Sequence, residues 1–302
     1  MEITQEFAVR LAAEIERNVT LALQEDIGTG DLTALLTPAG NRSRGTVVCR
    51  ENAVLAGRPW FESCFRHLDP DAIIRWSCKD GESVVAGQTL CEIEANTRAL
   101  LSAERPALNF LQTLSATATM TRRYVQAVAG TRAHIVDTRK TLPGLRLAQK
   151  YAVRCGGGHN HRLGLYDGIL IKENHIIAAG GVTEALQRAR TLDRRDVFIQ
   201  IEVESLDQLD EALDAGATMI LLDNMDLAQM REAVRRNDRR KSLWDDRRKS
   251  PGDKGHAKLE ASGGVNLDTV RAIAETGVDR ISIGALTKDI RAIDLSLRHS
   301  EE

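Results

Sequence analysis

A stretch of positive charge runs through the middle of the chain, from Asp137 to His175. It holds seven lysine and arginine residues against three acidic ones, and three of the seven histidines of the chain. The whole chain has a formal net charge of −2, so the positive field is local. Cations focused in a nearly neutral chain are typical of a pocket for a small polyanion, and they argue against a nucleic-acid surface.

Polar and glycine-rich residues also recur where apolar segments end. Two of them are carboxylates, Glu202 and Asp223, and such groups on neighbouring strands suit ribose hydroxyls and a Mg²⁺ ion that keeps water and phosphate ligands. The segment from Ser262 to Gly264, before a predicted helix, would offer backbone N–H groups to a phosphate. Arginine forks suit carboxylates, and lysines act as point charges. A polycarboxylate, a ribose, phosphates and Mg²⁺ together point to phosphoribosyl transfer.

The elements that must position these residues follow from the hydrophobic pattern after residue 131. Short apolar strands alternate with helices there, which predicts a parallel α/β architecture of six β/α units. A parallel barrel brings the C-terminal ends of its strands to one rim, where barrel active sites lie. The predicted strands cover 132–138, 167–172, 197–205, 217–225, 257–265 and 278–287. The residues at their ends are Arg139 and Lys140, Lys172, Glu202, Asp223, Ser262 to Gly264, and Ser282 to Gly284.

The first part of the chain has a different pattern. Residues 6–25 have the spacing of a helix, and a β-rich region with two hairpin turns follows it. Residues 103–130 are interpreted as a helix pair, or as one helix bent near Ser115, with Pro106 in its first turn. The hairpins resemble the hammerhead of biotinyl and lipoyl modules, but the lysine that is modified there is absent, so we interpret them as structural.

Composition bounds the class of protein. The chain has 302 residues, 42% of them hydrophobic and 28% charged, as expected for a globular protein of one large or two ordinary domains. No apolar run is long enough to span a membrane. The five cysteines are odd in number and scattered, so we expect free thiols in a reducing cytoplasm. Cys155 beside three glycines could act as a nucleophile, but no motif supports this role.

A basic segment, 235–258, interrupts the α/β pattern. It contains ten basic and four acidic residues, and the sequence DRRKS at 238–242 recurs at 246–250. The charge could suit nucleic acid or a protein partner. We interpret it instead as a solvated, mobile insertion that is dispensable for chemistry, and we expect no nucleic-acid or membrane partner.

Several motifs, which together cover nearly the whole chain outside this insertion, resemble the quinolinate phosphoribosyltransferase family. They are ALQEDIGTGDLT, ERPALNFLQTLSATAT, DTRKTLPGLRLAQKYAVRCGGGHNHRLGLYDGILIKENHI, EVESLDQLDEAL, ILLDNM, LEASGGV and ISIGALT. The resemblance implies an N-terminal α/β sandwich domain, 1–115, with the C-terminal tail 288–302 as a candidate addition to it. It also implies an incomplete parallel α/β barrel, 116–287, that carries the insertion.

The resemblance also implies a set of site residues. Residues that match the substrate-binding positions of the family are Arg139, Lys140, His161, Arg162 and Lys172 for quinolinate, and Ser262, Gly263, Gly264, Ser282 and Gly284 for phosphates. Thr138 and Lys288 are further substrate-binding candidates, without an assigned part of the substrates. Glu202 and Asp223 match the carboxylates for ribose and Mg²⁺, directly or through water. Arg105 matches an arginine that completes the site of the neighbouring subunit, so we expect a homodimer or a higher oligomer in the cytoplasm.

The expected reaction joins quinolinate to phosphoribosyl pyrophosphate and releases pyrophosphate and CO2, which gives nicotinate mononucleotide in NAD biosynthesis. The pyridine nitrogen has a free lone pair, so no general base is needed, and Lys140 is the candidate that protonates the ring carbon. The catalytic residues would be Lys140, Glu202 and Asp223.

Three alternatives remain open at this point. A relative of the same fold, such as a paralogue associated with molybdenum operons, could use another nitrogenous acid. A barrel lyase could use Lys172 as a Schiff-base amine, although Glu202 and Asp223 would then have no role. A non-enzymatic module could bind through the hammerhead-like segment and the basic insertion.

Overall fold

The computed structural model describes residues 5–192, 197–245 and 256–300, and the chain divides into two compact units. Unit 1 comprises Met1–Arg122, Lys140–Gly158 and Leu286–Glu302, and unit 2 comprises Arg123–Arg139 and His159–Ala285. The chain therefore crosses between the units four times. The domain boundary near residue 115 stays a prediction.

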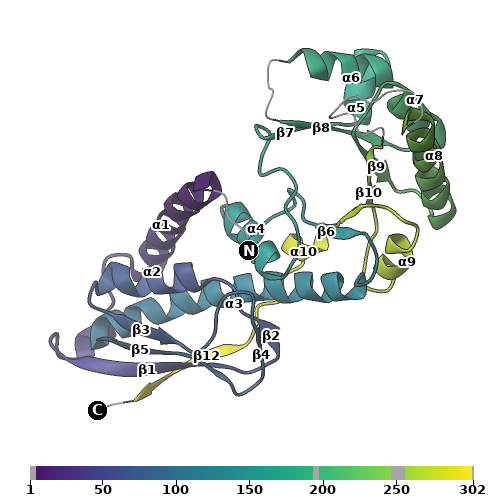
Figure 1. Ribbon diagram of the computed structural model, residues 1–302. Helices are drawn as coiled ribbons and strands as arrows, with labels where there is room; N and C mark the ends of the chain where they lie inside the picture. The colour runs from purple at the N-terminus through teal and green to yellow at the C-terminus, as the bar shows by residue number, and fades with distance from the viewer. Residues whose placement is uncertain (1–4, 193–196, 246–255, 301–302) are drawn as a thin grey trace. The chain divides into compact units, whose positions relative to one another are not determined.

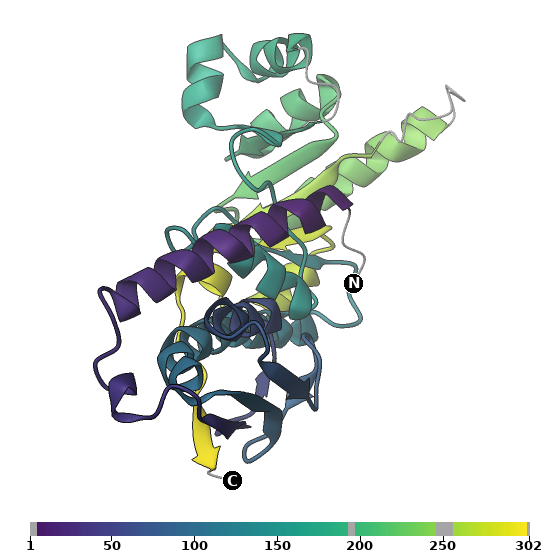
Figure 2. The same cartoon turned by 90° about the vertical axis from the view of Figure 1, so that its left-hand side faces the viewer.

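Unit 1 contains a four-stranded antiparallel sheet in the order β12-β1-β5-β3. Its strands are β1 (Arg42–Cys49), β3 (Ile73–Trp76), β5 (Thr89–Asn96) and β12 (Leu295–Ser300). A small second sheet pairs β2 (Ala53–Val54) with β4 (Ser83–Val84). The strand nearest the C-terminus thus lies beside the first strand of the chain, as the yellow and purple arrows show (Figure 2).

The helices of unit 1 bury apolar side chains against this sheet and against one another. They are α1 (Gln5–Ile27), the short 3₁₀ helix η1 (Ala34–Leu36), α2 (Arg58–Leu68), the first part of α3 (Thr97–Ala127), α4 (Arg146–Cys155) and most of α10 (Ala285–Lys288). Helix α1 buries Phe7, Leu11, Val19 and Leu23, which recur at helical spacing. Helices α2 and α3 lie along one face of the sheet (Figure 1).

The segment interpreted as a helix pair, or as one bent helix, forms a single helix. Helix α3 runs without interruption for 31 residues and begins at Thr97, before the predicted start. The expectation that Pro106 lies in a first turn is therefore wrong, because it occupies the interior of the helix. The proline signal was misleading because packing on both sides of the helix outweighs the hydrogen bond that proline lacks. Leu108, Leu111 and Leu114, all buried, provide that packing.

Unit 2 contains the predicted six parallel strands. Their order is β6-β11-β10-β9-β8-β7, and every two neighbours in this order are parallel. The strands are β6 (His134–Val136), β7 (Gly168–Ile171), β8 (Phe198–Val203), β9 (Met219–Asp223), β10 (Lys258–Ser262) and β11 (Arg280–Ser282). Strands β6 and β7 lie at the two ends of this order, as expected for an incomplete barrel.

Helices connect these strands and pack on their neighbours in sequence. They are α5 (Glu173–Ala179), α6 (Val182–Thr191), α7 (Leu206–Asp214), α8 (Leu227–Asp245) and α9 (Val270–Ala274). Helices α5 to α8 lie on one side of β7, β8 and β9 (Figure 1). Each amphipathic helix buries one row of apolar side chains against the sheet. Because the helices cover the strands, the strand sequences are short apolar runs.

The start of the basic segment differs from the prediction of a mobile insertion. Helix α8 continues to Asp245, and Arg236 and Arg240 both bind Asp210 of α7. The buried Asn237 side chain bonds the backbone of Ala257 twice: its Nδ2 donates to the carbonyl at 2.8 Å, and its Oδ1 accepts from the N–H at 3.1 Å. The second DRRKS copy, 246–250, lies outside the described residues.

Two expectations from composition can be compared with the structure. All five cysteines are free and buried, as predicted. Among the helices of the described residues, none is long and apolar enough to cross a membrane.

Candidate active site

The parallel ladder of unit 2 places the predicted strand ends along one edge of the sheet. Asp223 of β9 pairs in register with Ser262 of β10, and Ser282 of β11 pairs with Val136 of β6. Ile171 of β7 pairs with Ile201 of β8, so the residues that follow them lie side by side. Parallel strands that end together expose their last residues at a common edge, where α/β proteins bind ligands.

At this edge a lysine and a carboxylate form an ion pair. Lys172 follows β7, and its Nζ lies 2.8 Å from Glu202 Oε2 on β8. The lysine side chain is 50% exposed, whereas the glutamate side chain is 13% exposed. The pair therefore joins a predicted quinolinate cation to a predicted ribose and Mg²⁺ carboxylate.

Two guanidinium groups contribute positive charge to the same edge. Arg162 is buried, and its Nη1 donates to the carbonyl of Gly168 at 3.1 Å. Burial and the nearby charge of Arg139 lower the pKa of Arg162 from its ordinary value. Arg162 nevertheless remains protonated near neutral pH because guanidinium pKa values lie so high. Two like charges held together in a partly desolvated place favour an anion as their partner.

The loop that carries Arg162 is held by a buried aspartate at the end of β6. Asp137 Oδ1 accepts the backbone N–H of His161 at 2.8 Å, and its Oδ2 accepts the amide of Asn160 at 2.6 Å. The backbone N–H of Asp137 donates to the carbonyl of His159. These bonds connect the loop 159–162 to the strand that precedes Arg139.

His161 is a buried member of this loop. Its Nδ1 accepts the backbone N–H of Arg162 at 2.7 Å, so the ring proton lies on Nε2, which donates to Gln200 Oε1 at 2.8 Å. The expected place of His161 among the cations that bind quinolinate stays a prediction. Glu260 Oε1, fully buried, lies 3.8 Å from the same Nε2, and its Oε2 lies 3.0 Å from Arg280 Nε.

The carboxylate of Asp223 is oriented by its neighbour in sequence. Asn224 has a φ of 53°, and its Nδ2 donates to Asp223 Oδ2 at 2.8 Å. Its backbone N–H donates to the carbonyl of Ser262 at 2.9 Å. Gly263, with a φ of 108°, lies so close to the Asn224 amide that a side chain would collide with it. The glycine-rich segment and the Asp223 turn therefore form one packed structure.

The other predicted residues are placed as follows. The Ser282 hydroxyl is buried and donates to the carbonyl of Ala261 at 3.4 Å. Thr138 and Gly284 are half-buried in unit 2, and Gly264 is exposed there. Arg105, Lys140 and Lys288 belong to unit 1 and are exposed there. All of these assignments stay predictions.

Comparison with models of protein families shows to which family the chain belongs. A model of the quinolinate phosphoribosyl transferase C-terminal domain matches residues 117–298, and one of the N-terminal domain matches residues 31–115. The chain belongs to the quinolinate phosphoribosyltransferase family. The resemblance seen in the sequence is thereby confirmed, and so is the mixed α/β fold with a parallel six-stranded sheet.

Individual relatives of the family are similar over nearly their full length. The chain is 42% identical to the nicotinate-nucleotide pyrophosphorylase [carboxylating] of Mycobacterium leprae, over 91% of this chain and 94% of the relative. It is 40% identical to the probable enzyme of that name from Bacillus subtilis, over 90% and 89%. The solved nicotinate-nucleotide pyrophosphorylase of Francisella tularensis superimposes with a TM-score of 0.86 at 42% identity, over 95% and 96% of the two chains.

Sequence reasoning missed several polar residues that support the family motifs. Asn224, Gln200 and Glu260 lie on or beside the predicted strands, and Arg280 is the first residue of β11. Each was hidden inside an apolar run or read as part of a motif. The signal that could have found Glu260 is a charged residue in the middle of a segment predicted to be buried on both faces.

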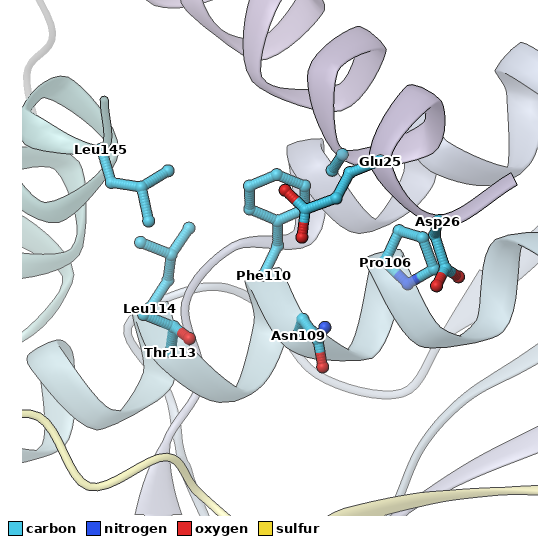
Figure 3. A pocket seen from close by; sticks show the side chains of 9 residues that line it. Glu25, Asp26, Pro106, Asn109, Phe110, Thr113, Leu114 and Leu145 are labelled. Atoms are coloured by element: carbon cyan, nitrogen blue, oxygen red, sulfur yellow. The ribbon is translucent and has the colours of Figure 1, made fainter. Parts of the chain in front are cut away.

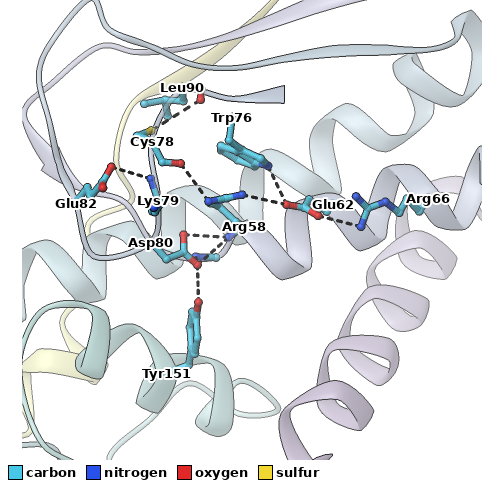
Figure 4. Close-up of polar contacts among 11 residues, drawn as sticks. Arg58, Glu62, Arg66, Trp76, Cys78, Lys79, Asp80, Glu82, Leu90 and Tyr151 are labelled. Atoms are coloured by element: carbon cyan, nitrogen blue, oxygen red, sulfur yellow. Dashed lines mark hydrogen bonds and ion pairs between the residues drawn. The ribbon is translucent and has the colours of Figure 1, made fainter. Parts of the chain in front are cut away.

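Two hollows of unit 1 are lined by other residues. One, of about 150 Å³, lies between α1 and α3 beside Phe110 and Leu145 (Figure 3). The other, of about 450 Å³, lies between α2 and Tyr151, where Arg58 and Arg66 both pair with Glu62 (Figure 4). No predicted site residue lines either hollow.

The suggestion that Cys155 is a nucleophile is not supported. The residue ends α4, is buried, and has its thiol pKa raised by burial from 9.0 to about 12. A nucleophilic cysteine needs a lowered pKa and access to solvent.

Proposed function

We propose that the chain transfers the phosphoribosyl group of phosphoribosyl pyrophosphate to quinolinate and releases pyrophosphate and CO2. The product is nicotinate mononucleotide, a precursor of NAD. The observation that carries this proposal is the order of charges along the edge of unit 2, with guanidinium groups after β6, an ion pair across β7 and β8, and a carboxylate after β9. Membership of the family and the names of the relatives support the same reaction.

The cations suit the two carboxylates of quinolinate. Arg139 and Arg162 supply planar donors that match carboxylate geometry, and Lys172 supplies a mobile charge. A mono-acid such as nicotinate would leave part of this positive charge without a partner, and unpaired buried charges are costly. Quinolinate is therefore the substrate that this set of charges favours over nicotinate.

The carboxylates suit the second substrate. Glu202 and Asp223 belong to the neighbouring strands β8 and β9, and oxygen donors of this kind fit Mg²⁺. Among the described residues no group of three or more potential ligands could form a complete protein cage for a metal. Mg²⁺ held by these two carboxylates, directly or through water, would supply positive charge to the pyrophosphate. The backbone of 262–264 would hold a phosphate.

The reaction then needs little proton transfer. The pyridine nitrogen attacks C1 of the ribose, and the carbon–oxygen bond to pyrophosphate breaks. Glu202 and Asp223 stabilise positive charge that develops at the ribose and orient its hydroxyls. The new pyridinium accepts the electron pair of the bond to the 2-carboxylate, CO2 leaves, and the ring carbon takes one proton. Lys140, exposed in unit 1, is our candidate donor.

We further propose a cytoplasmic homodimer in which Arg105 completes the site of the partner subunit. Arg105 lies in α3 with a side chain that is 58% exposed, and its nearest ion pair, to Glu104, is long at 4.0 Å. Leu32, Leu35 and Leu36 expose apolar surface in the same unit, as subunit interfaces do. Free thiols support a reducing compartment.

The test is a comparison of acids in the presence of phosphoribosyl pyrophosphate and Mg²⁺. Quinolinate should yield nicotinate mononucleotide, whereas nicotinate and other pyridine and pyrimidine acids should yield no nucleotide. Turnover of another acid instead of quinolinate would contradict the proposal and would favour the alternative of a paralogue of the same fold with a different acid substrate.

A further inference from the structure

Two of the three glycines after α4, Gly156 and Gly158, pack closely against α3. A side chain at Gly156 would lie 2.5 Å from the carbonyl oxygen of Ala118 and 2.5 Å from Thr121 Cβ, both on α3. A side chain at Gly158 would lie 2.7 Å from Thr121 Cγ2. Only glycine lets the backbone approach the helix this closely. The end of α4 therefore rests directly on α3 within unit 1.

One arginine joins these two elements. Arg122 of α3 donates from Nε to the carbonyl of Gly156 at 2.9 Å, and from Nη2 to the carbonyls of Gly81 and Cys155 at 3.1 Å and 3.2 Å. Gly81, in the turn between β3 and β4, has a φ of 89° and approaches the Cys155 carbonyl. This turn therefore also packs against the end of α4. We call this set of three carbonyls and the guanidinium the Arg122 clamp.

The clamp supplies hydrogen bonds to carbonyl groups at the C-terminal end of α4. The last carbonyls of a helix have no partner within the helix, and they carry partial negative charge. Burial of such groups without hydrogen bonds is costly, and a guanidinium is well suited to several of them because its donors diverge in one plane. Arg122 thus fixes the place at which α4 ends.

The position of the clamp along the chain gives it a wider consequence. Arg122 is the last residue of unit 1 before α3 enters unit 2 at Arg123. Gly156 lies two residues before Gly158, after which the chain enters unit 2 again at His159. The clamp thus joins two of the four crossings on their unit 1 side. The segment that leaves after Gly158 carries His161 and Arg162, whose backbone and side chains form the bonds described above.

We propose that Arg122 is a positioning residue for the quinolinate-binding loop 159–162, because it fixes the end from which this loop departs. The inference rests on the proposed function, since it assigns the loop to quinolinate. Arg122 itself touches neither substrate. A displacement of about 1 Å at a binding group can lower the rate about 100-fold, so a loss of the clamp should affect quinolinate more than phosphoribosyl pyrophosphate.

The chain supplies a matched control. Arg123 is the next residue of the same helix and is exposed, so Arg123→Ala removes the same charge without the clamp. In steady-state kinetics Arg122→Ala should raise the KM for quinolinate about 10- to 100-fold, while the KM for phosphoribosyl pyrophosphate stays within a factor of about two of the Arg123→Ala value. Equal increases in both KM values, or none, would overturn the proposal.

Chemical rescue distinguishes positioning from a general loss of structure. Methylguanidine or ethylguanidine should lower the KM of Arg122→Ala for quinolinate, and should leave Arg123→Ala unchanged. If Arg122→Ala does not fold, Arg122→Lys serves instead, because an ammonium group cannot reach three diverging carbonyls as a guanidinium does. A normal quinolinate KM in a folded Arg122→Lys variant whose Gly157 and Gly158 amides exchange faster than in the wild type would contradict the proposal.

Hydrogen exchange tests the clamp without any substrate. The amides of Gly157 and Gly158 donate to Arg154 and Val153, and they should exchange faster in Arg122→Ala than in Arg123→Ala. If the amides exchange faster in Arg122→Ala but the wild-type protein does not turn over quinolinate, the clamp is supported and the proposed function is rejected. Unchanged exchange would reject the clamp while the proposed function stands.

Discussion

The Nζ atom of Lys172 lies 2.8 Å from the Oε2 atom of Glu202, across the neighbouring strands β7 and β8. The pair joins a group assigned to the acid substrate with a group assigned to the ribose and Mg²⁺. Each must exchange this partner, at least in part, when its own ligand binds. From these assignments we expect the two substrate regions to be coupled electrostatically.

A substitution of Lys172 should separate these two effects. Lys172→Met should lower kcat/KM for quinolinate about 10- to 1000-fold, since one charge contact in the transition state is lost. The same variant should need less Mg²⁺ for half-maximal activity, because Glu202 no longer has a competing cation. Titration with Mg²⁺ at saturating quinolinate measures this. Lys258→Met, an exposed lysine at the other end of β10, is the control. An increased Mg²⁺ requirement in Lys172→Met would contradict the coupling.

Asn224 should affect the phosphoribosyl pyrophosphate side alone. Asn224→Gly keeps the left-handed backbone and removes the amide that donates to Asp223. A hydrogen bond to a charged group contributes about 1.5–3 kcal/mol, so the KM for phosphoribosyl pyrophosphate should rise about tenfold or more. Asn224→Ala should show the same kinetic effect and a lower melting temperature, because alanine is strained at this φ. An increased KM for quinolinate in Asn224→Gly would contradict this prediction and would assign Asn224 to the binding of quinolinate.

The sequence predicts much of unit 2 because its signals are local. Each buried strand is a short apolar run, and each is followed by a polar or glycine residue at the site edge. The ladder order, in which β6 pairs with β11 at the other end of the chain, depends on contacts that no short window contains. For the same reason the sequence did not reveal that Asp137 holds His161, or that Asn237 holds Ala257.

Where the sequence misled us, a tertiary contact outweighed a local preference. Pro106 lies inside α3 although proline favours the first turn, because buried leucines hold the helix. Helix α8 extends into the basic segment, since Arg236 and Arg240 find Asp210 on α7.

The buried thiol of Cys155 predicts a pH dependence of stability. Burial raises its pKa from 9.0 to about 12, so the unfolded chain loses this proton at lower pH than the folded chain. The contribution is present below pH 9 and is lost as the pH rises toward 12. Melting temperatures should therefore fall above pH 9, and less steeply in Cys155→Ala. Activity should persist in that variant, and iodoacetamide should not label Cys155 in the native protein at pH 8. Loss of turnover in a folded Cys155→Ala would restore a chemical role.

Asn237 should stabilise the structure without affecting catalysis. Asn237→Ala leaves the N–H and the carbonyl of Ala257 without their partner, so the free energy of unfolding should fall by about 1–3 kcal/mol. Both KM values should remain unchanged. Arg235→Ala, which removes only a surface ion pair with Glu232, should change stability little. Denaturant titration compares the two variants, and equal stability would show that the Asn237 contact is not important.

The proposed dimer can be tested by mixing two inactive variants. Arg105→Ala and Arg139→Ala should each have little activity, but a mixed dimer would contain one site with both arginines intact. Random reassociation should therefore restore about a quarter of the wild-type activity, given an isologous dimer with two sites. Refolding the variants together, and each alone as a control, provides the measurement. Activity that equals the sum of the separate variants would place Arg105 in its own subunit's site, or in none.

The most direct test of the central claim follows the two products of one reaction at once. Quinolinate labelled with ¹³C in the 2-carboxylate is incubated with phosphoribosyl pyrophosphate and Mg²⁺, and nicotinate mononucleotide and labelled CO2 are measured together. We predict equal amounts of the two products, no nucleotide from nicotinate, and a loss of both products in Arg139→Ala. A folded wild-type protein that forms neither product, or an Arg139→Ala variant with near-normal turnover, would contradict the account.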